Sequence, residues 1–141
     1  MNRRPGPIVW GSIVVAAAAT IACGRANDAA KLTELQRLRS GTLDVVLLSQ
    51  RDALRHGKDT FMIEFRSTSG GSLADAGTVG ASATMPMPGM PMFGSIEVKR
   101  SDVAGRYAAN GEFGMAGTWR MTIQWEGPAG HGSVTFPGTV Q

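Results

Sequence analysis

Short stretches in which apolar and polar residues alternate dominate the chain from residue 40 onward. In 60–66, Phe61, Ile63 and Phe65 share one face of an extended segment, and 118–125 repeats this alternation with larger side chains. Alternation with a period of two is typical of a half-buried β-strand. Clusters of small and polar residues between these segments indicate turns. The expected strands are 42–49, 60–66, 73–84, 95–100, 105–110, 118–125 and 131–136.

About seven strands with regularly spaced turns predict one all-β domain at 41–141, an immunoglobulin-like β-sandwich, with a small barrel as the competing architecture. The 19 Gly and 7 Pro agree with this, because they favour turns over a helical bundle. One Cys excludes an internal disulfide, so burial alone must stabilise the sheets. The expected core consists of Val46, Leu48, Phe61, Ile63, Phe65, Tyr107, Trp119, Met121, Ile123 and Trp125.

The amino terminus has the layout of a secretory signal. Two arginines precede the apolar run Ile8–Ala22, which is shorter than the roughly 20 residues of a membrane-spanning helix. Small residues then precede Cys23, and the segment resembles a bacterial lipoprotein signal cleaved before a lipid-modified cysteine. We therefore expect a signal peptide at 1–22 and a protein anchored on the periplasmic side of a bacterial envelope. An ordinary signal peptide, or an uncleaved anchor with an incidental cysteine, is the alternative.

Residues 23–40 are expected to form a short helical or flexible tether. Leu32, Leu35 and Leu38 recur every three residues, as on one side of a short amphipathic helix. This segment either holds the domain away from the membrane or packs on the edge of the domain.

Charge and missing motifs exclude several classes of function. The net charge is +3, but removal of 1–22 leaves 12 Lys and Arg against 11 Asp and Glu, a net charge of +1. Nucleic-acid binding needs many neutralised phosphates, so we expect none. We find no nucleophile motif or phosphate-binding loop in the sequence, and its acidic residues are scattered. We therefore expect no enzymatic activity.

A methionine cluster is the most unusual feature of the sequence. Three prolines and a glycine separate its members, and proline is confined to edge strands and loops. Thioether sulfur is a soft, neutral ligand that suits Cu(I). Three or four such groups would collect one ion, and Met115 or His131 would complete the set if the fold brings them near. The clustered methionines are Met85, Met87, Met90 and Met92.

Two readings without metal remain open for this cluster. Methionine fills irregular gaps and packs well on aromatic rings, so the loop would fold over Trp119 or Phe93. Alternatively, the methionines form an adaptable surface that binds a partner protein.

Three blocks of sequence resemble the YtkA-like domain family. They are the run Met85–Met92, then Gly105-Arg106-Tyr107, then Phe113–Trp119, and the resemblance extends from Gly41 to Val140. It implies an immunoglobulin-like extracytoplasmic domain, often in a lipoprotein and near heavy-metal efflux adaptors or copper-oxidase assembly. It also implies that the four clustered methionines and Met115 are the candidate metal ligands. The residues that match the family pattern in structural roles are Gly105, Tyr107, Gly117 and Trp119.

Together these observations predict a lipid-anchored accessory protein for copper handling or efflux. Its expected partners are the membrane, through Cys23, and a heavy-metal efflux adaptor or another envelope complex. The alternative is an interaction module without metal that docks on a membrane or envelope complex.

Overall fold

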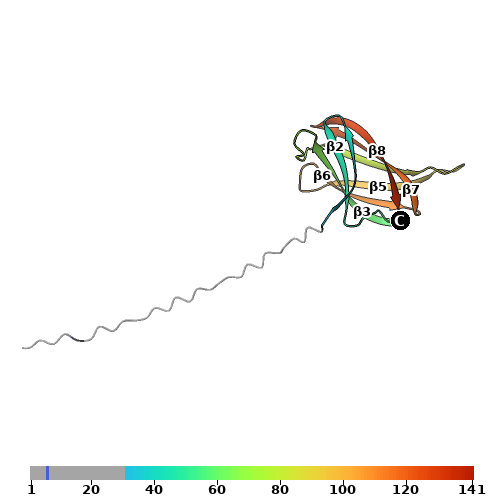
Figure 1. The fold of residues 1–141 in the computed structure, drawn as a ribbon, viewed down its shortest axis with the longest axis horizontal. Coiled ribbons are helices and arrows are strands. Elements are labelled where there is room, and N and C mark those ends of the chain that lie inside the picture. The colour runs from blue at the N-terminus through green and yellow to red at the C-terminus, as the bar shows by residue number, and fades with distance from the viewer. Residues whose placement is uncertain (1–5, 7–30) are drawn as a thin grey trace, which may run out of the picture.

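The structure is a computed structural model that describes Gly6 and residues 31–141 (Figure 1). The predicted signal peptide, apart from Gly6, and the predicted lipidation site Cys23 lie outside the described residues. The described part is built from strands, and no helix of membrane-spanning length and apolarity occurs in it. The strands are β1 (Thr33–Ser40), β2 (Leu43–Ser49), β3 (Gly57–Ser67), β4 (Thr78–Met85), β5 (Met92–Arg100), β6 (Arg106–Phe113), β7 (Gly117–Gly127) and β8 (Gly130–Val140).

All eight strands belong to one antiparallel sheet. Their order is β1-β2-β3-β6-β5-β4-β7-β8. The two edge strands approach each other, since the Gln36 side-chain amide of β1 donates a hydrogen bond of 2.9 Å to the Pro137 carbonyl of β8. The sheet is therefore nearly closed on itself. The predicted all-β class is confirmed, with eight strands in place of about seven.

Strand β1 is the element that the sequence pattern misassigned. Residues 33–40 were expected to belong to a helical or flexible tether, but they pair with β2 along its length. A bulge shifts the register between Glu34 and Gln36. One extra residue lets Leu35 and Leu38 both pack against the core despite their odd spacing. The same leucine spacing fits a helical turn, which explains the error.

The core lies inside the curved sheet. In one strand, β2, the side chains that face the core are not those predicted. Val45 and Leu47 of β2 point into it, rather than Val46 and Leu48. Val46 is also buried, but it lies on the outer face beside its cross-strand neighbours Arg37 and Glu64. Because both faces of β2 carry apolar residues, the sequence pattern did not show which face of this strand points into the core. The other predicted core residues lie in the core.

A hydrogen-bonded corner fixes the start of β4. Asp75 accepts a bond of 2.8 Å from the Gly77 backbone N–H and is paired with Arg100. These contacts, the Gly77 bond first, hold the pKa of the Asp75 carboxyl below its usual range. The buried Tyr107 hydroxyl donates to the Gly77 carbonyl at 2.9 Å, and burial raises its pKa. The corner ties β4 to β6 and thereby sets the direction in which β4 runs.

Candidate functional site: a methionine hairpin

Strands β4 and β5 form a hairpin that carries the predicted methionine cluster. Met85, the last residue of β4, and Met92, the first of β5, are cross-strand partners. Side chains of such partners lie on the same face and are close neighbours. The hairpin extends beyond the body of the sheet (Figure 1). The cluster therefore lies on a projecting hairpin, in accord with the edge or loop position that its prolines predicted.

A tight turn closes the hairpin. Pro88 and Gly89 occupy its centre, and Gly89 has a φ of 84°. Proline followed by a glycine of positive φ suits the two central positions of a type II turn. Met85 and Met92 share one face of the hairpin, and Met87 and Met90 lie in the unpaired loop 86–91 beyond them.

The connection between β6 and β7 crosses that same face. In the sheet, β6 adjoins β5 and β7 adjoins β4, so the link Gly114–Ala116 must pass over the width of the hairpin. We call this link the strap. A Cβ at Gly114 would lie 3.0 Å from the Met92 methyl group, and a Cβ at Gly117 would collide with that of Met85. The strap thus lies directly against the two methionines at the base of the hairpin.

Met115 lies in the middle of the strap. Its carbonyl accepts a hydrogen bond of 3.0 Å from the indole N–H of Trp119, which fixes the strap to the start of β7. The Met115 side chain is 40% exposed. The fold therefore brings Met115 to the base of the hairpin, beside Met85 and Met92.

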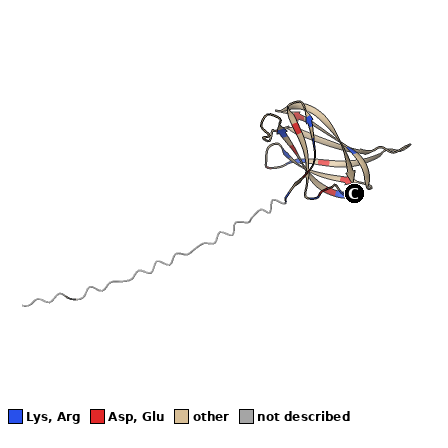
Figure 2. Ribbon diagram, in the orientation of Figure 1, with Lys and Arg blue, Asp and Glu red and all other residues tan. Residues whose placement is uncertain are grey.

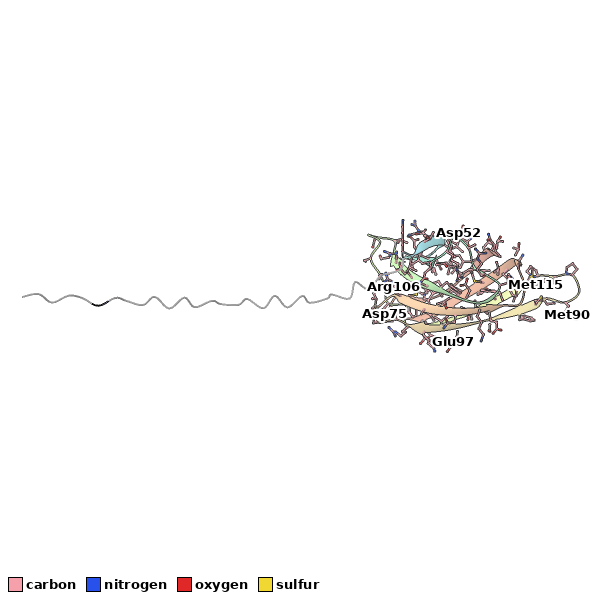
Figure 3. All side chains as sticks on the ribbon, turned by 90° about the horizontal axis from the view of Figure 1, so that it is seen from below. Asp52, Asp75, Met90, Glu97, Arg106 and Met115 are labelled. Atoms are coloured by element: carbon pink, nitrogen blue, oxygen red, sulfur yellow. The ribbon has the colours of Figure 1, made fainter. Side chains whose placement is uncertain are left out.

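The five methionines differ in their surroundings. Met85 and Met92 are half-buried and pack against the core. Met87 is 42% exposed and Met90 is 77% exposed, and Figure 3 places Met90 at the far tip of the hairpin, beyond Met115. Packing alone accounts for the pair at the base. It does not account for the pair at the tip, which contributes little to the core.

His131 does not join the methionines. It pairs with Glu126 close to the far end of β7, nine residues from Gly117, or roughly 30 Å along the strand. Among the described residues, no cluster of three or more His, Cys, Asp or Glu side chains is placed to hold a metal ion. The methionine hairpin is therefore the soft-donor cluster that the described chain offers.

The residues predicted to have structural roles surround this hairpin or support the sheet behind it. Trp119 and Tyr107 are fully buried in the core, and Trp119 packs edge-on against Phe113. Gly105 has a φ of 85°, and a Cβ there would collide with the backbone of Ala74. Gly117 begins β7 and leaves the space that Met85 occupies.

The hairpin itself carries no ionisable side chain, and the neighbouring strands place Arg120 opposite Thr84 and Glu112 opposite Ser95. Residues 76–96 contain no Lys, Arg, Asp or Glu, and Figure 2 shows the projecting hairpin without charged residues. Neutral thioethers need no deprotonation before they bind a metal. A soft ion would therefore bind here without release of a proton and without attraction by fixed charge.

The sequence did not reveal the part played by the strap glycines. Gly114 and Gly117 are needed because a non-neighbouring hairpin passes against them, and nothing in the local pattern 113–119 indicates that approach. The available signal was the Gly-x-x-Gly spacing around Met115. This spacing indicates a close approach of the hairpin only once it is known that the link from β6 to β7 crosses over it.

Comparison with known proteins adds one match. A family model described as YtkA-like matches residues 38–124, which include the hairpin and the strap. No curated protein and no solved structure is similar enough to match the chain.

Proposed function

The chain belongs to the YtkA-like family, and from that premise we propose that it is an extracytoplasmic, lipid-anchored accessory protein that handles copper as Cu(I). Copper is the cargo, and the methionine hairpin with its strap is the site that binds it. The acceptor in this proposal is a heavy-metal efflux adaptor or another envelope complex. No catalytic step is part of the proposal.

The observation that carries the proposal is that two separate connections bring methionines to the same end of the sheet. Met85 and Met92 are paired at the base of the hairpin, and the strap brings Met115 across the same face. Soft thioethers select Cu(I) over hard cations. Neutral sulfur donors on and beside an uncharged hairpin suit reversible capture of a soft cation.

The test is an oxygen-free Cu(I) competition titration against a chromophoric chelator. The full chain is used in mild detergent with Cys23→Ser, because a free thiol at Cys23 would itself bind Cu(I). Leucine at positions 85, 87, 90 and 92 keeps the apolar volume and removes the sulfur. We expect one equivalent of Cu(I) in the parent and a loss of affinity of at least about 100-fold in the fourfold variant.

Met62→Leu is the matched control. Met62 is half-buried on β3 and lies outside the hairpin and the strap, so its replacement should leave Cu(I) affinity unchanged. A parent that binds no Cu(I), or a fourfold variant that folds and keeps the parent's affinity, would contradict the proposal.

One observation favours a second candidate function. Phe93 is 75% exposed beside the hairpin loop, and Met90 is equally exposed at the tip. Together they offer apolar surface that a partner protein would bury without any metal. If the titration shows no Cu(I) binding, a docking module for an envelope complex becomes the better explanation, and Phe93→Ser should then weaken the complex.

A further inference from the structure

The methionines fall into two groups that differ in their place along the hairpin. The first group is Met85, Met92 and Met115, which we call the holding set. The second is Met87 and Met90, which we call the exchange pair. We propose that Cu(I) is held by the holding set and enters and leaves through the exchange pair. This inference rests on the proposed function and goes beyond it, because it assigns separate tasks to residues of the same site.

The hairpin register places the two groups in line. Met87 and Met90 lie two residues from Met85 and Met92, respectively, in the loop that continues the hairpin beyond its last strand pair. Two residues of extended chain span about 7 Å. The exchange pair is therefore one step beyond the holding set along the hairpin. That is a distance that flexible methionine side chains can bridge.

Burial separates Met85 and Met92 from the exchange pair, whereas Met115 on the strap is 40% exposed, close to the 42% of Met87. The methyl groups of Met85 and Met92 lie against Gly117 and Gly114, and both side chains pack against the core. The exchange pair lies past the strap, and Met90 is the most exposed large apolar residue of the described chain, at 77%. An incoming protein can reach the exchange pair without opening the fold, whereas the strap covers Met85 and Met92.

Coordination number gives the two groups different affinities. The holding set supplies three thioethers, which is about the number that Cu(I) requires. The exchange pair supplies two, so an ion bound there keeps a position open for a sulfur or nitrogen donor of the acceptor. Transfer then proceeds by ligand exchange: one Cu–S bond forms as another breaks, copper stays Cu(I), and no proton moves because thioethers are neutral.

The experiment measures affinity and transfer rate separately. The Cys23→Ser protein is loaded with one equivalent of Cu(I) and mixed in a stopped-flow instrument with bicinchoninate, a chromophoric acceptor. The double variant Met87→Leu/Met90→Leu should keep affinity within about threefold of the parent and transfer copper at least about tenfold more slowly. The double variant Met85→Leu/Met92→Leu should lose at least about 30-fold in affinity.

The outcomes distinguish the proposed function, Cu(I) binding, from the inference that the methionines form a holding set and an exchange pair. If the parent binds Cu(I) but the tip variant transfers it at the parental rate, the exchange pair is wrong and the proposed function stands. Equal losses of affinity in both double variants would show one shared site and overturn the division into two groups. A parent without Cu(I) binding would overturn both. Met62→Leu serves again as the control, and thermal unfolding of each variant shows that the fold is intact.

Discussion

At the scale of the residue, Gly117 helps to decide where the base of the methionine site lies, and Gly130 provides a comparison. Gly117 has a φ of 144°, and the space above it is filled by the Met85 methyl group. Gly130 also has a positive φ, of 99°, but nothing lies within 4 Å of a Cβ placed there. Both positions have a positive φ that disfavours a side chain, but a Cβ would collide with a neighbour only at Gly117. They therefore separate conformational strain from collision with a neighbour.

We expect Gly117→Ala to destabilise the protein by about 2–3 kcal/mol and Gly130→Ala by about 1 kcal/mol. The difference arises because alanine at Gly117 must displace Met85 as well as adopt an unfavourable φ. Urea unfolding of the two variants measures both free energies. In the double variant with Met85→Ala, the added cost at Gly117 should shrink, since the colliding methyl group is gone. Equal costs at the two glycines would contradict this account.

At the scale of the element, β1 shows how a strand can be hidden in a helix-like pattern. Its leucines are spaced for a helical turn, yet the bulge at Leu35 converts that spacing into two contacts on one face of the sheet. Arg37 and Arg39 on the outer face are paired with Glu34 and Asp44. Hydrogen bonds from these arginines hold the pKa values of both carboxyls below their usual range. Both arginine side chains are exposed although Asp44 is buried, so solvent screens the pairs and packing of the leucines is the main attachment of β1.

We expect Leu38→Ala to lower the free energy of unfolding by about 1–2 kcal/mol, less than for a fully buried leucine because Leu38 is only half-buried. A tether that does not pack on the domain would show no change. Arg39→Ala is the contrast, since the Arg39 side chain is 67% exposed and the buried Asp44 keeps Arg37 as a partner at 3.5 Å, so the loss should cost under about 1 kcal/mol. Denaturant unfolding of both variants tests the assignment. A Leu38→Ala variant as stable as the parent would remove β1 from the folded unit.

At the scale of the whole molecule, the methionine tip and the start of the described chain lie at opposite ends. Both views show the chain entering β1 on the side away from the projecting hairpin (Figures 1 and 3). Cys23 precedes Lys31 by eight residues, which span at most about 29 Å when fully extended. With a lipid anchor at Cys23, the charged body of the sheet would lie near the bilayer and the uncharged tip would point to partners in solution.

The expected outcome for the anchor is a protein that begins at Cys23 and carries lipid there. Intact-mass measurement of the membrane-extracted protein should show loss of residues 1–22 and the added mass of a diacylglycerol, with or without a further acyl chain. Cys23→Ser should move the protein to the soluble fraction or leave it unprocessed. A mature protein that retains residues 1–22, or that carries an unmodified thiol at Cys23, would contradict lipidation and remove this orientation argument.

The sequence by itself determined those features that depend on a single segment. For strands with one apolar and one polar face, such as β7, the sequence predicted both the strand and the side chains that face the core, because alternation is a property of one strand. The prolines likewise predicted a break in the ladder within Met85–Met92, where 86–91 is unpaired, since proline lacks the N–H that a ladder needs.

Only the tertiary structure decided which segments of the chain lie side by side. It alone showed that β1 completes the sheet, that Val45 rather than Val46 faces the core, and that the strap brings Met115 to the hairpin while His131 lies far away. These outcomes follow from strand order and from the crossing of β6 to β7. Both join segments distant in sequence, and local hydrophobic patterning carries no information about such pairings.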